Sequence, residues 1–429
     1  MSQLLFKNRR PGHTVLLDEF RQKGGYQGLE KALRELQPAQ IRDEVKASGL
    51  RGRGGAGFST GLKWSFFPFD APGDKYLVCN GDEMEPGTFK DRHLLEADPH
   101  QLLEGMALSA FALNITTGYI FLRYAYDQCY ANLQQAIGEA KQAGLLGRNI
   151  LGSEFSFELH VHRSAGRYIC GEETALLNGL EGKRPNPRSK PPFPAIKGLF
   201  AKPTVLNNIE TLANIPHIIN GGAQWFSDLA LTEEGAGTKL YGLSGHLNRP
   251  GCVELPMGVT IGELIEEHGG GVWQGHKFKA CLPGGASTPY LTAAHLDVAM
   301  DYVPLEAVKT RLGTGGLVVF DDQTCMVAAT LNLLRFFARE SCGWCTPCRD
   351  GLPMVCWVLE KIENGQGTID DIAMLRELRG HINGRSFCAL ALGAMGPVEG
   401  LLRLFEEEVL DHIKKGRCPF PRNSSLKES

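Results

Sequence analysis

The segment Ser341-Cys-Gly-Trp-Cys-Thr-Pro-Cys-Arg349 constrains the fold of this chain more than any other. It places Cys342, Cys345 and Cys348 within seven residues. Thiolates at the spacing C-x2-C-x2-C can surround one point, and this spacing ligates three irons of a [4Fe–4S] cluster. Structural zinc usually pairs two separated C-x2-C halves, and the sequence has no second half. We expect an iron–sulfur cluster, with zinc or an uncommitted group of thiols as the alternatives.

A cubane cluster needs a fourth ligand, which residues 349–352 cannot supply. Downstream candidates are Cys356, Cys388 and Cys418. Cys356 is expected along the helix after the motif, whereas Cys388 lies in a loop expected between two helices. The residues alone leave all three open, although the loop position favours Cys388.

A second constraint is the loop Leu50-Arg-Gly-Arg-Gly-Gly-Ala-Gly-Phe58, in which glycine and arginine interleave. Main-chain N–H groups of such a loop can approach phosphate closely, while arginine can neutralise its charge. Phe58, Lys63 and Phe66 add aromatic faces and another cation. This inventory suits a nucleotide, with phosphates in the glycines and the base on the rings.

The same loop matches the dinucleotide fingerprint G-x-G-x-x-G through Gly52, Gly54 and Gly57. The fingerprint requires a strand before the loop, yet residues 38–48 have the apolar spacing of a helix. We therefore favour a phosphate-binding loop of another design over a Rossmann turn, with a plain surface loop as the third interpretation.

Strands and helices alternate between residues 75 and 212. Expected strands cover residues 75–80, 118–123, 156–162 and the start of 204–212, and expected helices cover 100–113 and 126–143. This βαβα order predicts an α/β domain with a parallel sheet flanked by helices. We assign this Rossmann-like α/β domain, with its N-terminal lead-in, to residues 1–236.

Polar groups follow several of these elements. An acidic turn covers Gly81–Gly87, acids open a helix at Gly171–Glu173, and Asn207 and Asn208 end a strand. Solvated loops and helix caps are the ordinary explanations. Beside a phosphate-binding loop these groups could instead bind a nucleotide, and the carboxylates would repel a 2′-phosphate. The basic, proline-rich segment 183–194 is either a linker or part of that site.

The predicted secondary structure changes character twice in the rest of the chain. Residues 237–322 show a ββαβ order that suggests a small ubiquitin-like domain, with Thr260 and Glu263 as a capping box. Residues 323–429 are expected to form a helical bundle. Its amphipathic segments are 326–340, 351–362, 370–379 and 395–413.

Composition narrows the class of protein. The net charge of −3 argues against a dedicated nucleic-acid binder. The N-terminus lacks the apolar region of a secretory signal, and no apolar stretch is long enough to span a bilayer. We expect a cytosolic protein that meets a membrane only through partners. Disulfides are then unlikely for the twelve cysteines, and we interpret most of the nine scattered ones as small buried hydrophobes.

A nucleotide site and an iron–sulfur cluster on one chain predict electron transfer. A nicotinamide delivers two electrons as hydride, whereas a cluster accepts one, so a flavin is expected to split the pair. The polar segments offer enough groups for two nucleotides.

Six segments together resemble one family, the flavin-bearing, NADH-oxidising subunit of bacterial respiratory complex I. The resemblance extends from about residue 17 to residue 408 and is carried by Arg51–Phe58, Asn80–Gly87, Cys170–Ala175, Ser189–Pro194, Lys202–Thr204 and Glu340–Gly351. It implies an NADH dehydrogenase subunit that passes hydride from NADH to FMN. Single electrons then go to one [4Fe–4S] cluster, to clusters of partner subunits and towards quinone.

The resemblance also implies the site residues. It assigns FMN to Gly52, Arg53, Gly54, Gly55, Lys63, Asn80, Asp82, Glu83, Gly171, Glu172, Glu173, Asn207, Asn208, Thr211, Ala389 and Leu390. It assigns NADH to Gly55, Ala56, Phe58, Phe66, Glu85, Lys190 and Phe193. It makes Cys388 the fourth cluster ligand beside Cys342, Cys345 and Cys348. No side chain need act as acid or base, although Glu85 is placed near the nicotinamide.

The chain departs from the family pattern at three places. Gly81 stands where alanine is usual, and Ala201 stands where glycine is usual. After Cys388, the sequence Ala391-Leu-Gly-Ala-Met395 differs from the usual family sequence. This difference affects the flavin contacts that the resemblance implies for that loop.

Expected partners are a thioredoxin-like [2Fe–2S] subunit and a large multi-cluster iron–sulfur subunit, at the cytoplasmic face of the inner membrane. Neither nucleic-acid binding nor direct membrane insertion is expected.

Diaphorase subunits of NAD-reducing hydrogenases and NAD-dependent formate dehydrogenases share this core, but often carry an added domain. The single cysteine motif and short lead-in favour complex I. The alternative outside the enzymes is a non-catalytic scaffold protein whose cysteine motif binds a structural zinc ion. Asp82, Glu83 and Glu85 favour NADH over NADPH.

Overall fold

The computed structural model describes residues 3–420. The chain forms two compact units. The first comprises Met1–Met84, Thr88–Gly242 and Cys252–Val259, and the second comprises Glu85–Gly87, Leu243–Gly251 and Thr260–Ser429. The three-domain division stays a prediction, and its residues 1–2 and 421–429 lie outside the described residues.

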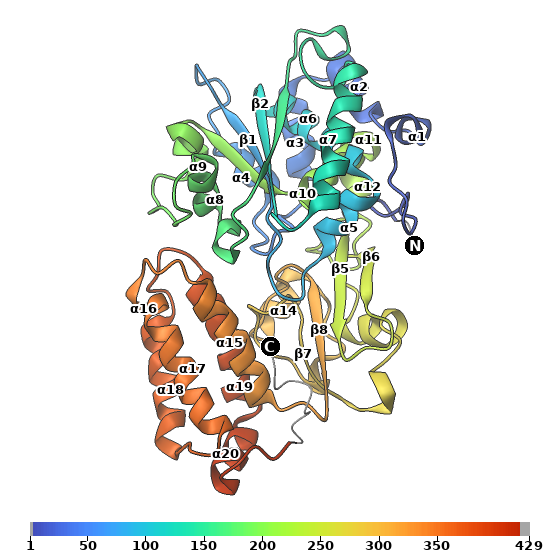
Figure 1. Ribbon diagram of the computed structural model, residues 1–429. Helices are drawn as coiled ribbons and strands as arrows, with labels where there is room; N and C mark the ends of the chain where they lie inside the picture. The colour runs from blue at the N-terminus through green and yellow to red at the C-terminus, as the bar shows by residue number, and fades with distance from the viewer. Residues whose placement is uncertain (1–2, 421–429) are drawn as a thin grey trace. The chain divides into compact units, whose positions relative to one another are not determined.

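The first unit contains a parallel sheet in the order β3-β2-β1-β4, as the βαβα alternation predicted (Figure 1). Its strands are β1 (Tyr76–Gly81), β2 (Thr117–Leu122), β3 (Glu158–Arg163) and β4 (Thr204–Asn208). Alternate residues of β1 face opposite ways: Leu77 and Cys79 join one apolar cluster and Val78 joins another. Because the sheet is covered on both faces, its strands read as continuous apolar runs rather than alternating ones.

Helices cover both faces of this sheet (Figure 1). They are α1 (Leu17–Gln22), α2 (Gln27–Glu35), α3 (Pro38–Ala47), α4 (Thr60–Ser65), α5 (Lys90–Ala97), α6 (Pro99–Leu113), α7 (Asp127–Gln142), α8 (Glu173–Leu180), α9 (Pro194–Lys197), α10 (Ile209–Ala213), α11 (Ile215–Gly221) and α12 (Ala223–Ser227). Helix α8 packs on the face that carries Val78, while α6 packs on the other face. The glycine loop joins α3 to α4, so no strand precedes it and the Rossmann turn is ruled out there.

Helix α6 is the centre of the first unit, and all of its residues except Phe111 are buried. It approaches α10 closely at Gly105, where an added Cβ would lie 2.0 Å from the carbonyl oxygen of Leu212. No residue larger than glycine fits without a shift of the backbone. This contact fixes α10, whose N-terminus begins directly after Asn208.

A second sheet has the order β6-β5-β8-β7 and comprises β5 (Thr238–Gly245), β6 (Gly251–Pro256), β7 (Phe278–Leu282) and β8 (Gly316–Asp321). The capping box of Thr260 and Glu263 begins α13 (Ile261–Glu263), as predicted. The strand β8 lies between β5 and β7 and was not predicted. Its run Leu-Val-Val-Phe between Gly316 and Asp321 is nevertheless a strand signal.

The C-terminal part of the second unit is helical, as predicted. Its helices are α14 (Tyr302–Ala307), α15 (Met326–Glu340), α16 (Thr346–Arg349), α17 (Gly351–Glu363), α18 (Ile369–Ile382), α19 (Leu390–Leu404) and α20 (Glu406–Lys415). Helix α17 packs between α15 and α18, and α19 packs on α15 (Figure 1).

The single helix expected over residues 395–413 is wrong. The chain breaks at Phe405, whose φ of −134° is not helical. Three acids, Glu406, Glu407 and Glu408, occupy the first turn of α20 and complement its N-terminal dipole, so they start a new helix.

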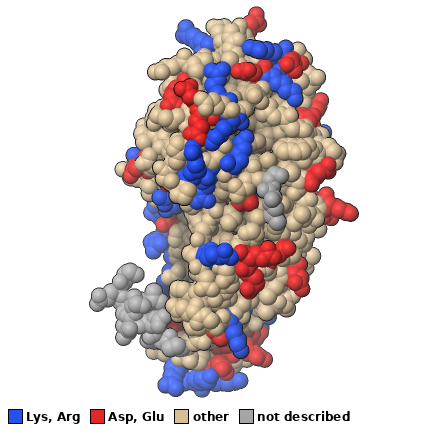
Figure 2. All heavy atoms as spheres, turned by 90° about the vertical axis from the view of Figure 1, so that its right-hand side faces the viewer, with Lys and Arg blue, Asp and Glu red and all other residues tan. Residues whose placement is uncertain are grey.

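Charged side chains of both signs are interspersed on the face that Figure 2 shows, in line with the small net charge of −3. Between residues 3 and 420, no helix is both long and apolar enough to cross a membrane.

Candidate functional site

The glycine loop of the first unit is closed at its base by backbone hydrogen bonds. The Gly52 N–H donates to the Phe58 carbonyl at 2.8 Å, and the Thr60 N–H donates to the Leu50 carbonyl at 2.9 Å. Gly55 and Gly57 have φ of 123° and 64°, which side-chain-bearing residues rarely adopt. An added Cβ at Gly54 would lie 3.1 Å from the Cβ of Asn208, so the loop lies against the end of β4.

The charged end of Arg53 braces this loop rather than facing a phosphate, which differs from our expectation. The buried Arg53 guanidinium donates to the carbonyls of Ala236 at 2.6 Å and Thr238 at 3.1 Å. Arg51 Nε donates to the Gly57 carbonyl at 2.6 Å. A buried guanidinium must find acceptors, and here those acceptors are carbonyls of the protein. The loop therefore offers a ligand its bare backbone.

The carboxyl ends of β1 and β4 bring several predicted residues together. Asn80 and Asn208 are partners in the register of these parallel strands. Asn80 Nδ2 donates to the Gly171 carbonyl at 2.8 Å, which ties in the turn before α8. Thr211 Oγ1 accepts from the Arg53 N–H at 2.8 Å, which ties in the glycine loop. Ligands of α/β proteins bind outside the carboxyl ends of parallel strands, and these residues lie at such an edge.

Asn207 and Asn208 hold the end of β4 in place. Asn207 Oδ1 accepts from the indole N–H of Trp64 at 3.1 Å. Asn208 caps α10 by accepting from the Glu210 N–H at 3.0 Å, as its N-cap propensity predicted. Its Nδ2 also donates to Asp91 Oδ2 at 2.6 Å.

Beneath these residues lies a buried group of charges that the sequence did not reveal. Lys90 Nζ lies 2.7 Å from Asp91 Oδ1 and 2.9 Å from Glu210 Oε2, and Lys239 Nζ lies 3.6 Å from the same Glu210 oxygen. Burial by itself would raise the pKa of Glu210, but the cations Lys239, Lys90 and Arg53 outweigh burial and the pKa is lowered. These residues resemble ordinary charges of helix ends in the sequence, so no signal identified them.

Asp82 and Glu83 follow β1 and are both buried. Asp82 Oδ1 accepts from the Ser164 hydroxyl at 2.9 Å. Its buried Oδ2 has no hydrogen-bond partner among residues 3–420. Burial raises the pKa of Asp82 to about 7, although Ser164 and Arg123 lower it. An unpaired buried acceptor is costly, so Asp82 has a free oxygen for a ligand.

The carboxylate of Glu83 is occupied by the protein. It accepts from the N–H groups of Asp91 at 3.0 Å and Arg92 at 3.2 Å, and from the Tyr126 hydroxyl at 3.0 Å. Glu83 thus satisfies the first turn of α5, and burial raises its pKa to about 7. Any contact of Glu83 with a cofactor is left mainly to its backbone.

Lys63, Glu172, Glu173 and Lys190 form a charged group. Glu173 lies 3.4 Å from Lys63 Nζ and is hydrogen-bonded to Lys190, which also lies 3.6 Å from Glu172. Burial would raise the pKa of Glu173, but the two lysines lower it overall. Glu172 Oε2 caps α8 by accepting from the N–H groups of residues 174 and 175 at 2.9 and 2.8 Å. The structure thus brings together predicted residues from three segments.

Three predicted aromatic side chains are exposed. Phe58 and Phe66 are 48% and 57% exposed, and their ring centroids lie 6.5 Å apart at a tilt of 38°. Phe193 is 57% exposed. Large exposed rings of this kind are typical of a ligand or partner surface. The adjacent Ala56 completes the loop beside Phe58.

Three predicted cofactor residues belong to the second unit. Glu85 Oε1 accepts from the Ser287 N–H at 2.7 Å. Ala389 is the N-cap of α19 and Leu390 is its buried first residue. The roles of these residues toward FMN and NADH stay predictions.

The cysteine motif of the second unit lies at the start of α16, and Cys345 occupies the N-cap position of this helix. The Phe387 N–H donates to Cys345 Sγ at 3.4 Å, and Ser341 Oγ lies 3.1 Å from Cys348 Sγ. The first bond holds the loop that carries Cys388, between α18 and α19, against the motif. Cys356 is buried within α17, and Cys418 joins a different group of side chains. This arrangement favours Cys388 among the three candidates.

Comparisons with known proteins match three parts of this chain to described families. Residues 45–217 match the family described as the Nuo51 FMN-binding domain. Residues 328–412 match the NADH-ubiquinone oxidoreductase-F iron-sulfur binding region, and residues 240–291 match the SLBB domain.

Two relatives that match nearly the whole chain are both F subunits of NADH-quinone oxidoreductase. The chain is 52% identical over 414 residues to the F subunit of NADH-quinone oxidoreductase of Escherichia coli strain K12, covering 96% of this chain and 93% of that protein. It is 51% identical to the NADH-quinone oxidoreductase F subunit numbered 2 of Rhizobium meliloti, covering 95% and 96%. A chain of the air-oxidised NAD+-reducing [NiFe]-hydrogenase is similar in structure, with a TM-score of 0.82 and 34% identity, covering 94% of this chain and 67% of that one.

The fold and site define an electron-input flavoprotein that oxidises NADH and carries FMN and a [4Fe–4S] cluster. The chain belongs to the family of NADH-quinone oxidoreductase F subunits, as the six motifs predicted. As a member of this family it is part of a multi-subunit complex.

The unpaired Asp82 predicts a pH dependence of stability. Because its pKa is raised from 3.8 to about 7, the folded chain keeps a proton that the unfolded chain releases in this range. Asp82 therefore lowers stability progressively as the pH rises from 3.8 to about 7. The free energy of unfolding of Asp82→Asn, relative to that of the wild type, should therefore rise by about 2–4 kcal/mol between pH 4 and pH 8. Urea unfolding of the FMN-free chain measures this difference. The exposed Asp70→Asn is the control, and parallel profiles for wild type and Asp82→Asn would contradict the assignment.

Proposed function

We propose that the carboxyl edge of the parallel sheet binds FMN and NADH, and that Cys342, Cys345, Cys348 and Cys388 ligate the cluster. The observation that carries the proposal is the convergence at one edge of the bare glycine loop, Asn80 and Thr211. When bound, FMN accepts a hydride from NADH and releases electrons singly, and the cluster takes up one electron at a time.

The residues of the first unit fit a flavin phosphate and its polar groups. The glycine loop has no Cβ at its exposed Gly54, and the guanidinium of Arg53 is bound by protein carbonyls, so the loop can present its backbone at Gly54 and Gly55 to a phosphate. Asp82 offers one unpaired carboxylate oxygen. The buried charges of Lys90, Asp91 and Glu210 position Asn208 and α10, so these residues need no rearrangement to receive a ligand.

The exposed pair Phe58 and Phe66 supports an adenine site, because base–aromatic stacking needs accessible rings. The adjacent group of Lys63, Glu172, Glu173 and Lys190 carries acids beside cations. Its carboxylates, with Asp82, disfavour a 2′-phosphate, so the site is suited to NADH rather than NADPH. None of these residues needs to exchange a proton with the substrate, and their task is to orient it.

The donors around the cysteine motif fit a cluster with four thiolates. An N–H···S bond to Cys345 stabilises negative charge on that sulfur. The hydroxyl of Ser341 can do the same for Cys348. Such hydrogen bonds to sulfur raise the reduction potential of an iron–sulfur cluster.

We propose that the partners are a thioredoxin-like [2Fe–2S] subunit and a large multi-cluster iron–sulfur subunit, at the cytoplasmic face of the membrane. Large exposed side chains lie on and beside the cysteine motif, which supports a protein interface there. Trp344, Met354, Trp357 and Phe387 are each at least 50% exposed. A diaphorase role in a hydrogenase is the second candidate, supported by the hydrogenase chain at 34% identity, but the 52% relative favours the quinone-linked complex.

The aromatic pair can be tested by truncation. Phe58→Ala combined with Phe66→Ala should raise the KM for NADH about tenfold or more, because stacking of a base contributes about 1–3 kcal/mol. Steady-state ferricyanide reduction measures KM, and the FMN content should not change. Trp225→Ala removes another exposed ring of the same unit and should leave KM unaltered. A double variant with wild-type KM would place the adenine elsewhere.

The fourth cluster ligand can be tested by comparing two cysteines of the helical part. Cys388→Ala should lose the cluster, with iron falling from about four atoms per chain to well below that number, while FMN stays bound. Cys356→Ala should keep its iron. Iron analysis and EPR of dithionite-reduced, anaerobically purified protein give the answer. Retention of the cluster in Cys388→Ala, with its loss in Cys356→Ala, would reverse the assignment.

A further inference from the structure

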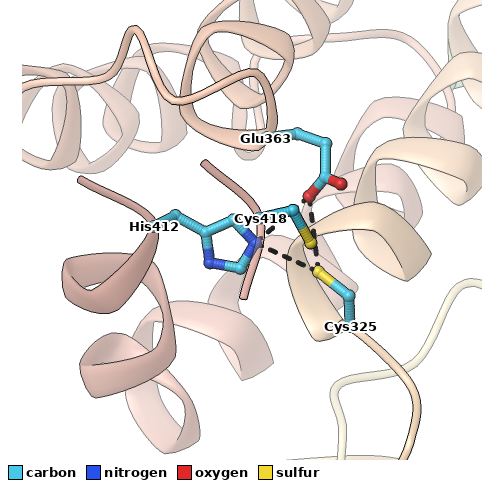
Figure 3. A group of neighbouring side chains, drawn as sticks. All are labelled: Cys325, Glu363, His412 and Cys418. Atoms are coloured by element: carbon cyan, nitrogen blue, oxygen red, sulfur yellow. Dashed lines mark hydrogen bonds and ion pairs between the residues drawn. The ribbon is translucent and has the colours of Figure 1, made fainter. Parts of the chain in front are cut away.

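The second unit contains another group of metal-ligating side chains besides the cysteine motif. Cys325, Glu363, His412 and Cys418 each point one ligand atom toward a common centre (Figure 3). These four atoms all lie within 4.8 Å of one another. His412 is fully buried and Cys325 is 9% exposed.

Four separate segments supply this group. Cys325 is the N-cap of α15, and its Sγ accepts from the Ala328 N–H at 3.3 Å. Glu363 is the last residue of α17, His412 lies in α20, and Cys418 follows the end of α20. The positive end of the α15 dipole favours a thiolate at Cys325.

The ring of His412 is oriented as in a metal site. Its Nδ1 lies 2.8 Å from the Glu408 carbonyl oxygen, which can only accept, so Nδ1 carries a proton. Its Nε2 therefore faces the centre, at 3.3 Å from Cys325 Sγ and 3.2 Å from Glu363 Oε2. Metal-ligating histidines commonly donate their second ring N–H to a carbonyl in this way.

Ordinary hydrogen bonding explains this group less well. A charged His412 paired with Glu363 would satisfy those two residues, but it leaves unexplained why two thiols converge on the same pair. Cys325 Sγ already lies 3.3 Å from each of Glu363 Oε2, His412 Nε2 and the Ala328 nitrogen. A divalent cation at the centre would offset two of the three negative charges that two thiolates and one carboxylate bring together.

We propose that Cys325, Glu363, His412 and Cys418 form a structural zinc site, distinct from the [4Fe–4S] cluster. Four ligands of mixed sulfur, nitrogen and oxygen type suit Zn²⁺ in a tetrahedral, closed site. Calcium and magnesium prefer oxygen ligands alone. Binding releases the protons of the two thiols, and of the imidazole if charged, with no change of oxidation state. The ion ties the start of α15 and the end of α17 to α20 and the turn that follows it.

Metal content tests this proposal on the full-length chain carrying its FMN and cluster. We expect about one zinc beside about four irons per chain after growth with zinc. Cys325→Ser combined with Cys418→Ser should lower zinc at least about tenfold while leaving iron unchanged. Cys356→Ala is the matched control, because it removes another buried cysteine of the same helical part, and it should keep its zinc.

Zinc-edge X-ray absorption of the wild type gives a result that does not depend on the folding of any variant. We expect two sulfur neighbours at about 2.3 Å and two nitrogen or oxygen neighbours at about 2.0–2.2 Å. A four-sulfur shell would place the zinc in the cysteine motif and overturn the proposal. Wild-type protein without zinc, or a double variant that retains it, would also overturn the proposal.

Discussion

The ion pairs of Glu210 are the interaction on which the proposed nucleotide-binding edge of the sheet depends. Its fully buried carboxylate contacts Lys90 and Lys239 and accepts from the Leu240 N–H at 2.8 Å. A buried charge is tolerated only when it is paired and hydrogen-bonded, so these groups fix one another. Because Glu210 lies in the first turn of α10, the same contacts position Asn208 and Thr211. The glycine loop is then held by Thr211 and by the buried guanidinium of Arg53. Four separate segments of the chain are thus held in place before any ligand binds.

The second unit is organised around sulfur. One cysteine motif lies at α16, where the loop that carries Cys388 donates an N–H to Cys345. The other sulfur-containing group joins α15, α17 and α20 through Cys325, Glu363 and His412. The cysteine motif has the ligands of an iron–sulfur redox centre. The group around Cys325 has the mixed ligands of a structural metal site. A helical part built of short helices gains order from such cross-links, because each one ties together segments that are distant in sequence.

The sequence predicted those features that are local. Strand and helix periodicity predicted the parallel sheet, and the motif Cys342–Cys348 indicated the cluster. The helix expected before Gly52 favoured a loop other than a Rossmann turn, and the structure confirms that helix. Features that depend on partners distant in sequence were missed or misjudged. Arg53 was expected to face phosphate, but its acceptors are carbonyls of residues 236 and 238. The grouping of Cys325 with Glu363 and His412 was missed, because nothing near Cys325 in the sequence indicates these two distant residues. The break at Phe405 was hidden because apolar residues continue on both sides of it.

The central claim is that one chain receives electron pairs at the glycine loop and passes single electrons to the cluster of Cys342, Cys345, Cys348 and Cys388. Anaerobic titration of the full-length chain with NADH, followed by flavin absorbance and by EPR of the cluster, tests it most directly. The account predicts bleaching of the flavin together with the signal of a reduced [4Fe–4S] cluster, at about 1.5 NADH per chain when both are filled. A flavin that stays oxidised, or a bleached flavin beside a cluster that never takes up an electron, would contradict it.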